Sequence, residues 1–330
     1  MADMKHQAPV AGKRGRRQWL QAGFVGLGGL LSGALLSACA EVEREHAARA
    51  DGMPRVLVPL RTIVGGRIIT KSSPTGMPIA QDGFGPMTHF VFPVALAADS
   101  FNLYVADAGV RRLYRFDPLV DAMAVVPGVV VTPQTRLALG KDLTLYVASP
   151  GVAPLRRYDR GGRLLMEINP QLGAARYDEV AVDRDSGTLF GLDRGFARLE
   201  EINPLGRSAT LIDDEILAQS PTAIAWDDHQ VYVAGAHCAC VVALASRMHP
   251  RRILATGLRQ PSAMAARDGW LVVLDTAERK FVIFNHGELR ATPGFETLGL
   301  SDPQGIALEG GMLYVADAGG RRVAIFRLLR

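Results

Sequence analysis

One pattern of about 42 residues recurs six times between residues 85 and 330. In each copy a short apolar strand is followed by a second strand written approximately Leu-Tyr-Val-Ala-Asp, then by a basic turn and a third strand. The second strands begin at intervals of 40 to 44 residues, at Leu103, Leu145, Leu189, Val231, Leu271 and Leu313. A repeat of this length indicates a solenoid, a propeller or another array, since one copy alone cannot bury its apolar face.

The strand content of each copy selects among these architectures. In the second copy, apolar runs at 135–139, 145–149 and 155–158 are followed by a fourth run at 164–168. These runs lack strict polar alternation, as expected for a sheet that is packed between two neighbours and has no solvent-facing side. Four-stranded units of this length are typical of propeller blades. We therefore predict an all-β fold, a six-bladed β-propeller of four-stranded antiparallel blades.

The two ends of the repeat region supply the missing strand. The sixth copy stops after its third strand, while a β-prone run at 59–64 precedes the first copy and is bounded by Gly65-Gly66. If this run forms the fourth strand of the last blade, the ring closes and no long sheet edge stays exposed. We therefore predict a propeller over residues 55–330 whose N-terminal strand closes the last blade.

The copies resemble the NHL repeat, whose pattern runs Pro-x-Gly-Ile-Ala-Val-Asp, Leu-Tyr-Val-Ala-Asp and then a basic Arg before Val-x-x-Phe. The sixth copy matches best, through Pro303, the run at 305–307, the run at 313–317, Arg322 and Phe326. The middle copies depart from the pattern, because Ser and Gly replace the Asp at positions 149 and 235. The resemblance covers about residues 58–330 and implies the propeller fold, which hosts enzymes and binding platforms alike.

The N-terminal segment has the features of an export signal. Arg16-Arg17 is followed by Gln-Trp-Leu and resembles the signal of the twin-arginine translocase. The apolar stretch 22–36 contains five glycines and is too short to span a bilayer comfortably. It ends in Leu-Ser-Ala before Cys39, which resembles a lipobox and implies a lipid on that cysteine. An uncleaved anchor or another cleavage site is the alternative.

These features predict a signal peptide over 1–38 and a flexible tether over 39–54. Ala40 stands where inner-membrane retention would use Asp, so we expect a periplasm-facing protein on the outer membrane of a Gram-negative bacterium. Contact with the membrane would be through the lipid anchor only.

The charge distribution excludes one class of partner. The net charge of +4 belongs to residues 1–38, which hold five basic residues and one acid. The remainder holds 32 basic and 32 acidic residues, so the body is neutral. A nucleic-acid binder needs a basic surface to neutralise phosphates, and the sequence contains no such stripe. We expect a monomer that binds a protein partner or a small polar ligand in the cell envelope, and we predict no cofactor.

Several acids end the second strands, and a basic residue follows at a fixed offset. Because an Asp that begins a turn bonds nearby backbone N–H groups, these acids are expected to stabilise turns rather than to form a metal site. The basic side chains are expected to pack between blades, some beside the acids. The acids are Asp107, Asp193, Asp275 and Asp317, and the basic residues are Arg112, Arg279 and Arg322.

The residues that begin the innermost strands surround the central channel and form the candidate ligand site. Its polar members are Arg136, Asp178, Glu179, Thr222, Ser262 and Gln304. Calcium-dependent lactonase propellers cage a cation with several axial acids, and the zinc-dependent amidating lyase uses histidines there. This ring has only two acids, next to an arginine, and no histidine. We predict a small polar ligand with Arg136 binding a carboxylate; the alternative is an Arg–acid pair that compensates itself.

The segment His237-Cys238-Ala239-Cys240 is a weak candidate for metal or redox chemistry, on the face of the channel mouth. Structural zinc needs four ligands and catalytic zinc three. If both cysteines lie in one strand, they point to opposite faces, which disfavours joint ligation and a bond between them. We expect a packed or locally bridged pair, with a metal or redox role as the alternative.

The sequence leaves three functions open. The first is an exported, lipid-anchored propeller that acts as a binding or scaffolding module. The second is a propeller enzyme, a hydrolase or lyase that uses Glu179 and Arg136 at the channel mouth. The third is a metal or redox accessory protein that uses His237, Cys238 and Cys240. Sequence spacing supports no Ser-His-Asp arrangement and no phosphate-binding glycine loop, so we predict the binding module and no catalytic residues.

Overall fold

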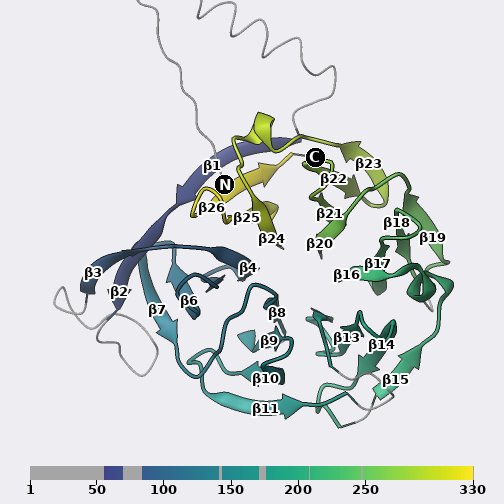
Figure 1. Ribbon diagram of the computed structural model, residues 1–330, viewed down its shortest axis with the longest axis horizontal. Helices are drawn as coiled ribbons and strands as arrows, with labels where there is room; N and C mark the ends of the chain where they lie inside the picture. The colour runs from purple at the N-terminus through teal and green to yellow at the C-terminus, as the bar shows by residue number, and fades with distance from the viewer. Residues whose placement is uncertain are drawn as a thin grey trace, which may run out of the picture. The chain divides into compact units, whose positions relative to one another are not determined.

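The structure is a computed structural model that describes residues 56–69, 84–140, 143–170, 176–207, 209–246 and 248–329. In this part of the chain, six β-sheets are arranged around a common axis, as Figure 1 shows. The predictions for Arg16, Arg17, Cys39, the signal peptide 1–38 and the tether 39–54 concern residues outside those ranges. No helix of the described ranges is both long and apolar enough to cross a membrane.

Blades 2 to 5 each contain four antiparallel strands that follow one another from the axis outward. Blade 2 contains β8 (Arg136–Leu139), β9 (Leu145–Ser149), β10 (Ala153–Tyr158) and β11 (Leu164–Ile168). Blade 3 contains β12 (Glu179–Val182), β13 (Leu189–Asp193), β14 (Arg198–Ile202) and β15 (Ala209–Ile212). Blade 4 contains β16 (Pro221–Asp227), β17 (Gln230–Gly235), β18 (Cys240–Ala243) and β19 (Arg252–Ala255). Blade 5 contains β20 (Pro261–Arg267), β21 (Trp270–Asp275), β22 (Lys280–Asn285) and β23 (Glu288–Ala291).

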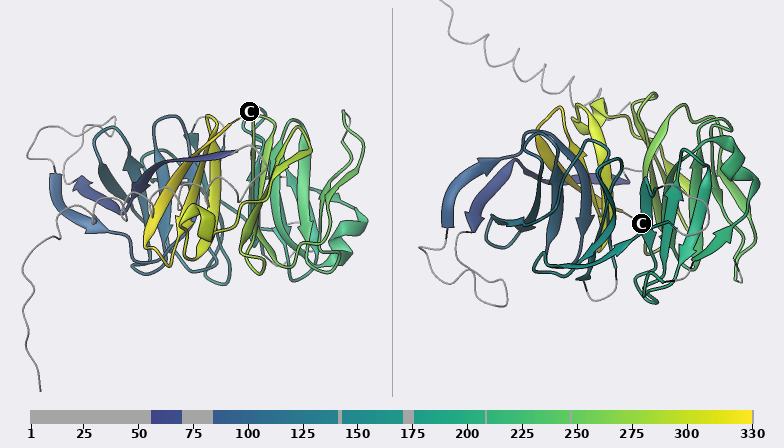
Figure 2. Two further views of the ribbon diagram at one scale, coloured as in Figure 1. Left: turned by 90° about the horizontal axis from the view of Figure 1, so that it is seen from above. Right: turned by 60° about the horizontal axis from the view of Figure 1, so that its bottom comes forward.

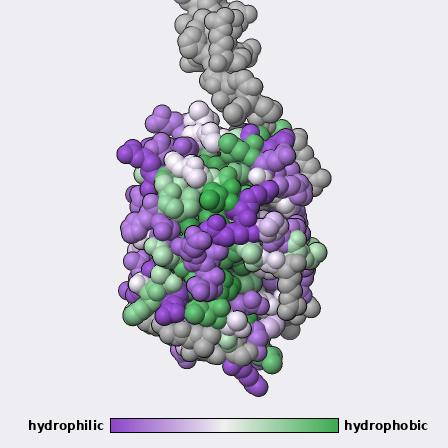
Figure 3. Space-filling view, turned by 90° about the vertical axis from the view of Figure 1, so that its right-hand side faces the viewer, coloured by the Kyte–Doolittle hydropathy of each residue, from purple (hydrophilic) through white to green (hydrophobic). Residues whose placement is uncertain are grey.

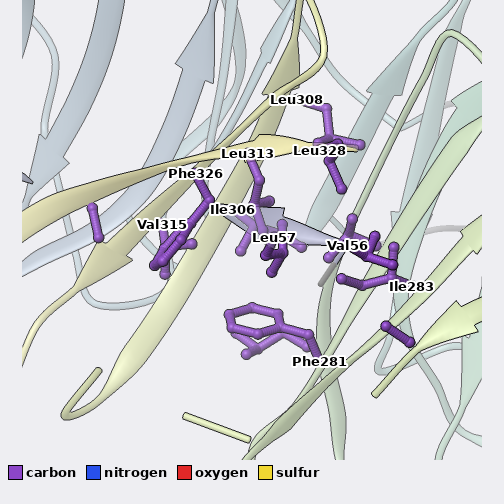
Figure 4. Packing of buried hydrophobic residues seen from close by; sticks show 14 of the residues in the cluster. Val56, Leu57, Phe281, Ile283, Ile306, Leu308, Leu313, Val315, Phe326 and Leu328 are labelled. Atoms are coloured by element: carbon purple, nitrogen blue, oxygen red, sulfur yellow. The ribbon is translucent and has the colours of Figure 1, made fainter. Parts of the chain in front are cut away.

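Blade 6 joins the two ends of the repeat region, as the sequence predicts. Its strands are β24 (Pro303–Glu309), β25 (Met312–Asp317), β26 (Arg322–Leu328) and, outermost, β1 (Leu57–Ile63). In the antiparallel register of β1 and β26, Leu57 lies opposite Leu328 and Ile63 opposite Val323. Figure 4 shows Leu57 and Leu328 in one buried cluster with Phe281 of blade 5. The predicted closure is therefore confirmed.

Blade 1 is larger than predicted. Besides β4 (Pro93–Ala98), β5 (Leu103–Asp107), β6 (Arg112–Asp117) and β7 (Ala122–Val126), its sheet includes β2 (Gly65–Ile69) and β3 (Phe84–His89). Strand β2 pairs in parallel with β7, and β3 pairs antiparallel with β2. This extra pair lies on the outer side of blade 1 in Figure 2.

The sequence predicts Gly65-Gly66 as the boundary of a strand, whereas in the structure these two residues begin β2. The geometry of Gly65 explains why glycine is needed there. Gly65 has a φ of +153°, and a Cβ built there would lie 1.9 Å from the carbonyl oxygen of Thr88. Glycine is therefore required by this close approach of two backbones, rather than by a free turn.

The core lies between the blades. Every residue of β4, β5, β9 and β21 is buried, because each sheet is covered by a neighbour on both faces. Each buried Leu, Val or Phe side chain contributes roughly 1.5–3 kcal/mol relative to exposure, which stabilises the stacking of blades. The outermost strands face solvent along much of their length. There, Ile253 and Leu289 are more than half exposed, and Figure 3 shows apolar side chains among polar ones on this outer wall.

Candidate functional site: the axial cavity and its two mouths

The innermost strands β4, β8, β12, β16, β20 and β24 contact one another in sequence around the axis, including β24 with β4. All six run in the same direction, because the residues at their C-terminal ends, from Ala98 of β4 to Leu308 of β24, line one cavity. We call the residues that begin these strands the leading mouth, and the residues that end them the trailing mouth. The predicted ligand site is the leading mouth.

The strand-end acids position the leading mouth. The carboxylate of Asp317, which is fully buried, accepts hydrogen bonds from the backbone N–H groups of Ser301 (3.0 Å), Asp302 (2.8 Å) and Gly320 (3.3 Å). It also accepts one from Arg322 Nε at 2.9 Å. Asp107, Asp193 and Asp275 make corresponding backbone bonds in blades 1, 3 and 5.

The predicted local turn bonds are therefore confirmed. Each acid additionally holds the loop that enters the innermost strand of its own blade, 15 to 17 residues earlier in the chain. The basic residues behave differently from one another. Arg322 pairs with its acid, whereas the Arg279 guanidinium lies over the ring of Phe295, 5.5 Å from the ring centroid.

The structure brings two of the predicted ligand residues together. Arg136 Nε donates to Glu179 Oε1 at 2.7 Å, linking blade 2 to blade 3, and Arg136 Nη1 donates to the carbonyl oxygen of Thr135 at 3.0 Å. Burial raises the pKa of the Glu179 carboxyl above its usual value, and the positive charges of Arg136 and Arg194 only partly oppose this. The pair corresponds to the self-compensating arrangement that the sequence left open.

The other four predicted residues bond within their own blades. Asp178 is 1% exposed, pairs with Arg176 Nε at 2.9 Å and accepts the N–H of Arg194. Within the described ranges, each of the remaining three side chains makes one hydrogen bond. Thr222 Oγ1 donates to the Ala234 carbonyl (3.4 Å), Ser262 Oγ to the Leu274 carbonyl (3.4 Å) and Gln304 Nε2 to Asp302 Oδ1 (2.8 Å). Their role in ligand binding stays a prediction.

A cavity of about 440 Å³ lies on the axis. Aliphatic residues in the middle of the innermost strands form its wall, among them Leu96, Leu137, Val180, Ile224 and Met264. None of the six predicted mouth residues belongs to this wall. Instead, the cavity extends to the trailing mouth, where the turns after the innermost strands carry charged side chains.

Sequence reasoning missed this trailing mouth, although the same alignment contains it. When the copies are aligned on Gly305, the equivalent positions are Ala95, Arg136, Glu179, Ala223, Ala263 and Gly305. Four residues after each of these positions, the chain has a charged residue in every copy except the second. Because alternate residues of a strand share a face, a shift of four keeps the side chains on the same face of the strand. The ring comprises Asp99, Gly140, Asp183, Asp227, Arg267 and Glu309.

The guanidinium of Arg184 crosses the trailing mouth. Arg184 follows β12 of blade 3, yet its Nη1 donates to Glu309 Oε2 of blade 6 at 2.7 Å and its Nη2 to the Ala98 carbonyl of blade 1 at 3.0 Å. Burial lowers the pKa of Arg184 from its usual value, and the charge of Arg267 acts in the same direction. The second arginine is held more loosely, since Arg267 Nε lies 3.7 Å from Glu309 Oε2.

The cysteine segment forms a disulfide between Cys238 and Cys240, with their Cα atoms 5.1 Å apart. The condition that disfavoured such a bond does not hold, because Cys238 lies in a turn and only Cys240 belongs to β18. Ala239 between them takes a positive φ of 50°, which turns both side chains to one side. In this state the sulfurs are not free thiolates for a metal. Across the described ranges, no group of three or more His, Cys, Asp or Glu side chains is arranged to hold a metal ion.

No family model matches the sequence, and no curated protein matches it. Among solved structures, the chain is similar to a gluconolactonase of Xanthomonas campestris, with 15% identity and a TM-score of 0.56, covering 73% of this chain and 87% of the other. It is also similar to virginiamycin B lyase of Staphylococcus aureus, with 13% identity and a TM-score of 0.54, covering 83% and 99%. A chain of a nidogen–laminin complex matches with 14% identity and a TM-score of 0.51, covering 66% and 88%. Likeness at these identities shows a shared propeller fold.

Proposed function

We propose that this chain is a binding or scaffolding module of the cell envelope, which captures a protein or a small polar ligand as a monomer. The segment around Arg16 and Arg17 directs its export, and a lipid on Cys39 holds it to the periplasmic side of the outer membrane. The disulfide between Cys238 and Cys240 is consistent with an oxidising compartment. The proposal extends to no resident cofactor.

One observation carries this proposal. The ring has a polar mouth at each end of its axis, with side chains that are already held in place: Arg136 pairs with Glu179 at the leading mouth, and Arg184 pairs with Glu309 at the trailing mouth, to which the axial cavity extends. A rigid ring with preorganised polar groups loses little conformational entropy when it binds a partner. The solved relatives include both enzymes and a chain of a laminin complex, so the fold is compatible with binding alone.

A second candidate function rests on Glu179. Its pKa is raised by burial while Arg136 lies within hydrogen-bonding distance, and a carboxyl of this kind at a channel mouth is a candidate general acid. In that case the chain is a hydrolase or lyase. A panel of lactones and esters tests this directly, because Glu179→Gln would then abolish turnover in protein that is still folded.

The leading mouth is tested by the double substitution Arg136→Gln and Glu179→Gln, which removes both charges and leaves no unpaired buried ion. Immobilised protein is incubated with envelope extract, and retained molecules are compared between variants. A specific ligand should be retained by the wild type and lost from the double variant. The control is Arg156→Gln with Glu167→Gln, an ion pair of the same 2.7 Å length on the outer strands of blade 2. Equal retention by both double variants would reject the leading mouth.

The export proposal has its own test. Cys39→Ser should move the protein from the membrane fraction to the soluble periplasmic fraction, and Arg16→Lys with Arg17→Lys should retain it in the cytoplasm. Unchanged membrane association of the Cys39→Ser protein would contradict the lipid anchor.

A further inference from the structure

We infer that the trailing mouth and the groove beside it form a second binding site, which takes an elongated organic cation with an apolar body. This inference goes beyond the proposed function, because it concerns the opposite end of the channel and assumes nothing about export or the leading mouth. It rests on two adjoining cavities, their excess of acidic side chains and a group of aromatic rings at the point where the cavities meet.

The first observation is that the axial cavity continues into a groove. A second cavity of about 660 Å³ lies between blades 3 and 4. Asp183, Trp226 and His229 line both this cavity and the axial one, so the two share a wall. The hollow therefore runs from the axis of the ring into the space between the two blades, which suits an elongated ligand better than a compact one.

The second observation is the balance of charge. Six acids line the two cavities, namely Asp183, Asp185, Glu201, Asp227, Asp228 and Asp268, against only Arg184 and Arg267. Both arginines lie against the carboxylate of Glu309, at 2.7 and 3.7 Å, so part of their charge is already compensated. A hollow with this balance attracts cations and repels anions.

The third observation is a group of aromatic rings at the wall that the two cavities share. The ring of Phe190 stacks on Trp226, with centroids 4.7 Å apart and planes inclined by 16°, and the His229 ring meets Trp226 edge-on. Indole rings attract alkylammonium and guanidinium groups through their negative faces, most strongly where acids lie close by. An acidic hollow with a tryptophan in its shared wall is therefore chemically suited to an organic cation.

The molecule already binds one such group in this region. The guanidinium of Arg184 occupies the space between the Glu309 carboxylate and the Ala98 carbonyl oxygen. Asp227, Asp228 and Asp268 on the adjacent turns supply the same kind of acceptor. One oxygen of Asp227 accepts the Gly269 N–H at 2.7 Å, and Asp228 and Asp268 lie 3.7 Å from His249 Nε2 and Arg267 Nε. These contacts leave carboxylate oxygens for a cation that enters from outside. Burial raises the pKa of Asp227, and a bound cation would relieve that cost.

The test uses three ten-carbon probes that differ in charge: decamethonium, 1,10-decanediol and decanedioate. Binding to the purified chain is measured by isothermal titration calorimetry at low salt. We expect decamethonium to bind at least tenfold more tightly than the diol, and decanedioate to bind least tightly. Addition of 0.5 M NaCl should weaken the binding of decamethonium severalfold. Equal binding of all three probes, preference for the dianion, or no binding of decamethonium up to millimolar concentration would overturn the assignment.

Two variants locate the site. Asp228 and Asp268 both have a positive φ, 47° and 54°, which asparagine also tolerates. Asp228→Asn with Asp268→Asn therefore removes two charges without backbone strain and should weaken decamethonium about three- to tenfold, by the typical size of exposed charge interactions. The control Asp121→Asn has the same backbone geometry, with a φ of 51°, on blade 1. Weaker decamethonium binding by the Asp121→Asn control would contradict the site. Unchanged binding by the double variant would also contradict it.

A third variant separates this inference from the proposed function. The double substitution Arg136→Gln and Glu179→Gln at the leading mouth should leave decamethonium affinity within twofold of the wild type. A loss there would assign the cation to the leading mouth and overturn the trailing site. Conversely, the leading mouth can lose its own ligand while decamethonium binding persists.

Discussion

Blades 4 and 6 hold the same turn by different chemistry. In blade 6 the turn after β25 is held by the buried carboxylate of Asp317, which accepts three backbone N–H groups and the guanidinium of Arg322. In blade 4 the corresponding residue, at the end of β17, is Gly235, and the Cys238–Cys240 disulfide joins the turn to the first residue of β18.

Blades 4 and 6 share one backbone hydrogen bond, which the disulfide supports in blade 4 and the Asp317 carboxylate supports in blade 6. In blade 6 the N–H of Ala318 donates to the Asp302 carbonyl at 2.9 Å, and in blade 4 the N–H of Ala236 donates to the Ser220 carbonyl at 3.0 Å. This bond joins the turn to the loop that enters the innermost strand, and so it positions the leading mouth. Among the described residues, blades 1, 4, 5 and 6 make this bond, whereas Pro150 of blade 2 has no N–H to donate. The difference between blades 4 and 6 teaches that the bond forms with or without the strand-end carboxylate, so the side chains that stabilise it are interchangeable.

The largest loss of stability should follow from replacing the buried carboxylate of Asp317. Asp317→Asn places an amide where the carboxylate accepts several N–H donors, so buried donors lose their acceptor. We expect a loss of about 3 kcal/mol in the free energy of unfolding, measured by urea denaturation. The control is Asp117→Asn, which loses only an exposed local bond to the N–H of Leu119 and should change stability by less than about 1 kcal/mol.

The second effect tests whether blade 4 has room for the missing carboxylate. A Cβ at position 235 would lie 2.8 Å from Cys238 Sγ and 3.1 Å from the carbonyl oxygen of Gln219. Gly235→Ala should therefore destabilise the bridged protein by about 2 kcal/mol. The same substitution combined with Cys238→Ala and Cys240→Ala should cost less. An equal cost in both backgrounds would show that the sulfur does not compete for that space.

The third effect is the loss of the bridge itself. Because the disulfide closes a very short loop, chain entropy predicts that Cys238→Ala with Cys240→Ala costs only about 1.5 kcal/mol. Thermal denaturation of the purified chain, with and without reductant, measures this difference. If removing the disulfide lowered the free energy of unfolding more than Asp317→Asn does, the disulfide would stabilise the protein more than the carboxylate, contrary to this prediction.

How far the sequence predicts these features depends on whether each one repeats. The regular spacing of the second strands and the run at 59–64 predict six blades and their closure correctly. The hairpin of β2 and β3 occurs once and has no periodic signal, so it could not be expected. The crossing of Arg184 from blade 3 to Glu309 of blade 6 depends on the ring geometry, which spacing does not contain. The disulfide depends on the positive φ of Ala239, which alanine rarely adopts.

The smallest expected effect on stability concerns Tyr104 and Tyr232, which occupy equivalent positions in blades 1 and 4. Burial raises the pKa of Tyr104 to about 12 and that of Tyr232 to about 12, with Asp227 adding to the effect on Tyr232. Unfolded tyrosine releases its proton near pH 10, so the folded state binds more protons between pH 10 and 12 and stability falls across that interval as pH rises.

Substitution separates the two tyrosines. The hydroxyl of Tyr104 is buried without a hydrogen-bond partner among the described atoms, so Tyr104→Phe should change stability at pH 7 by less than about 1 kcal/mol, or increase it. Both Tyr104→Phe and Tyr232→Phe should flatten the fall in stability above pH 10, followed by urea midpoints. An unchanged alkaline slope in both variants would contradict these pKa shifts.

Amide hydrogen exchange tests most directly whether the disulfide of blade 4 replaces the carboxylate of blade 6. Reduction of the Cys238–Cys240 bond should raise the exchange rate of the Ala236 amide at least tenfold and leave that of Ala318 unchanged. Unaltered exchange at Ala236, or an equal increase at Ala318, would contradict the claim that these two devices support the same bond.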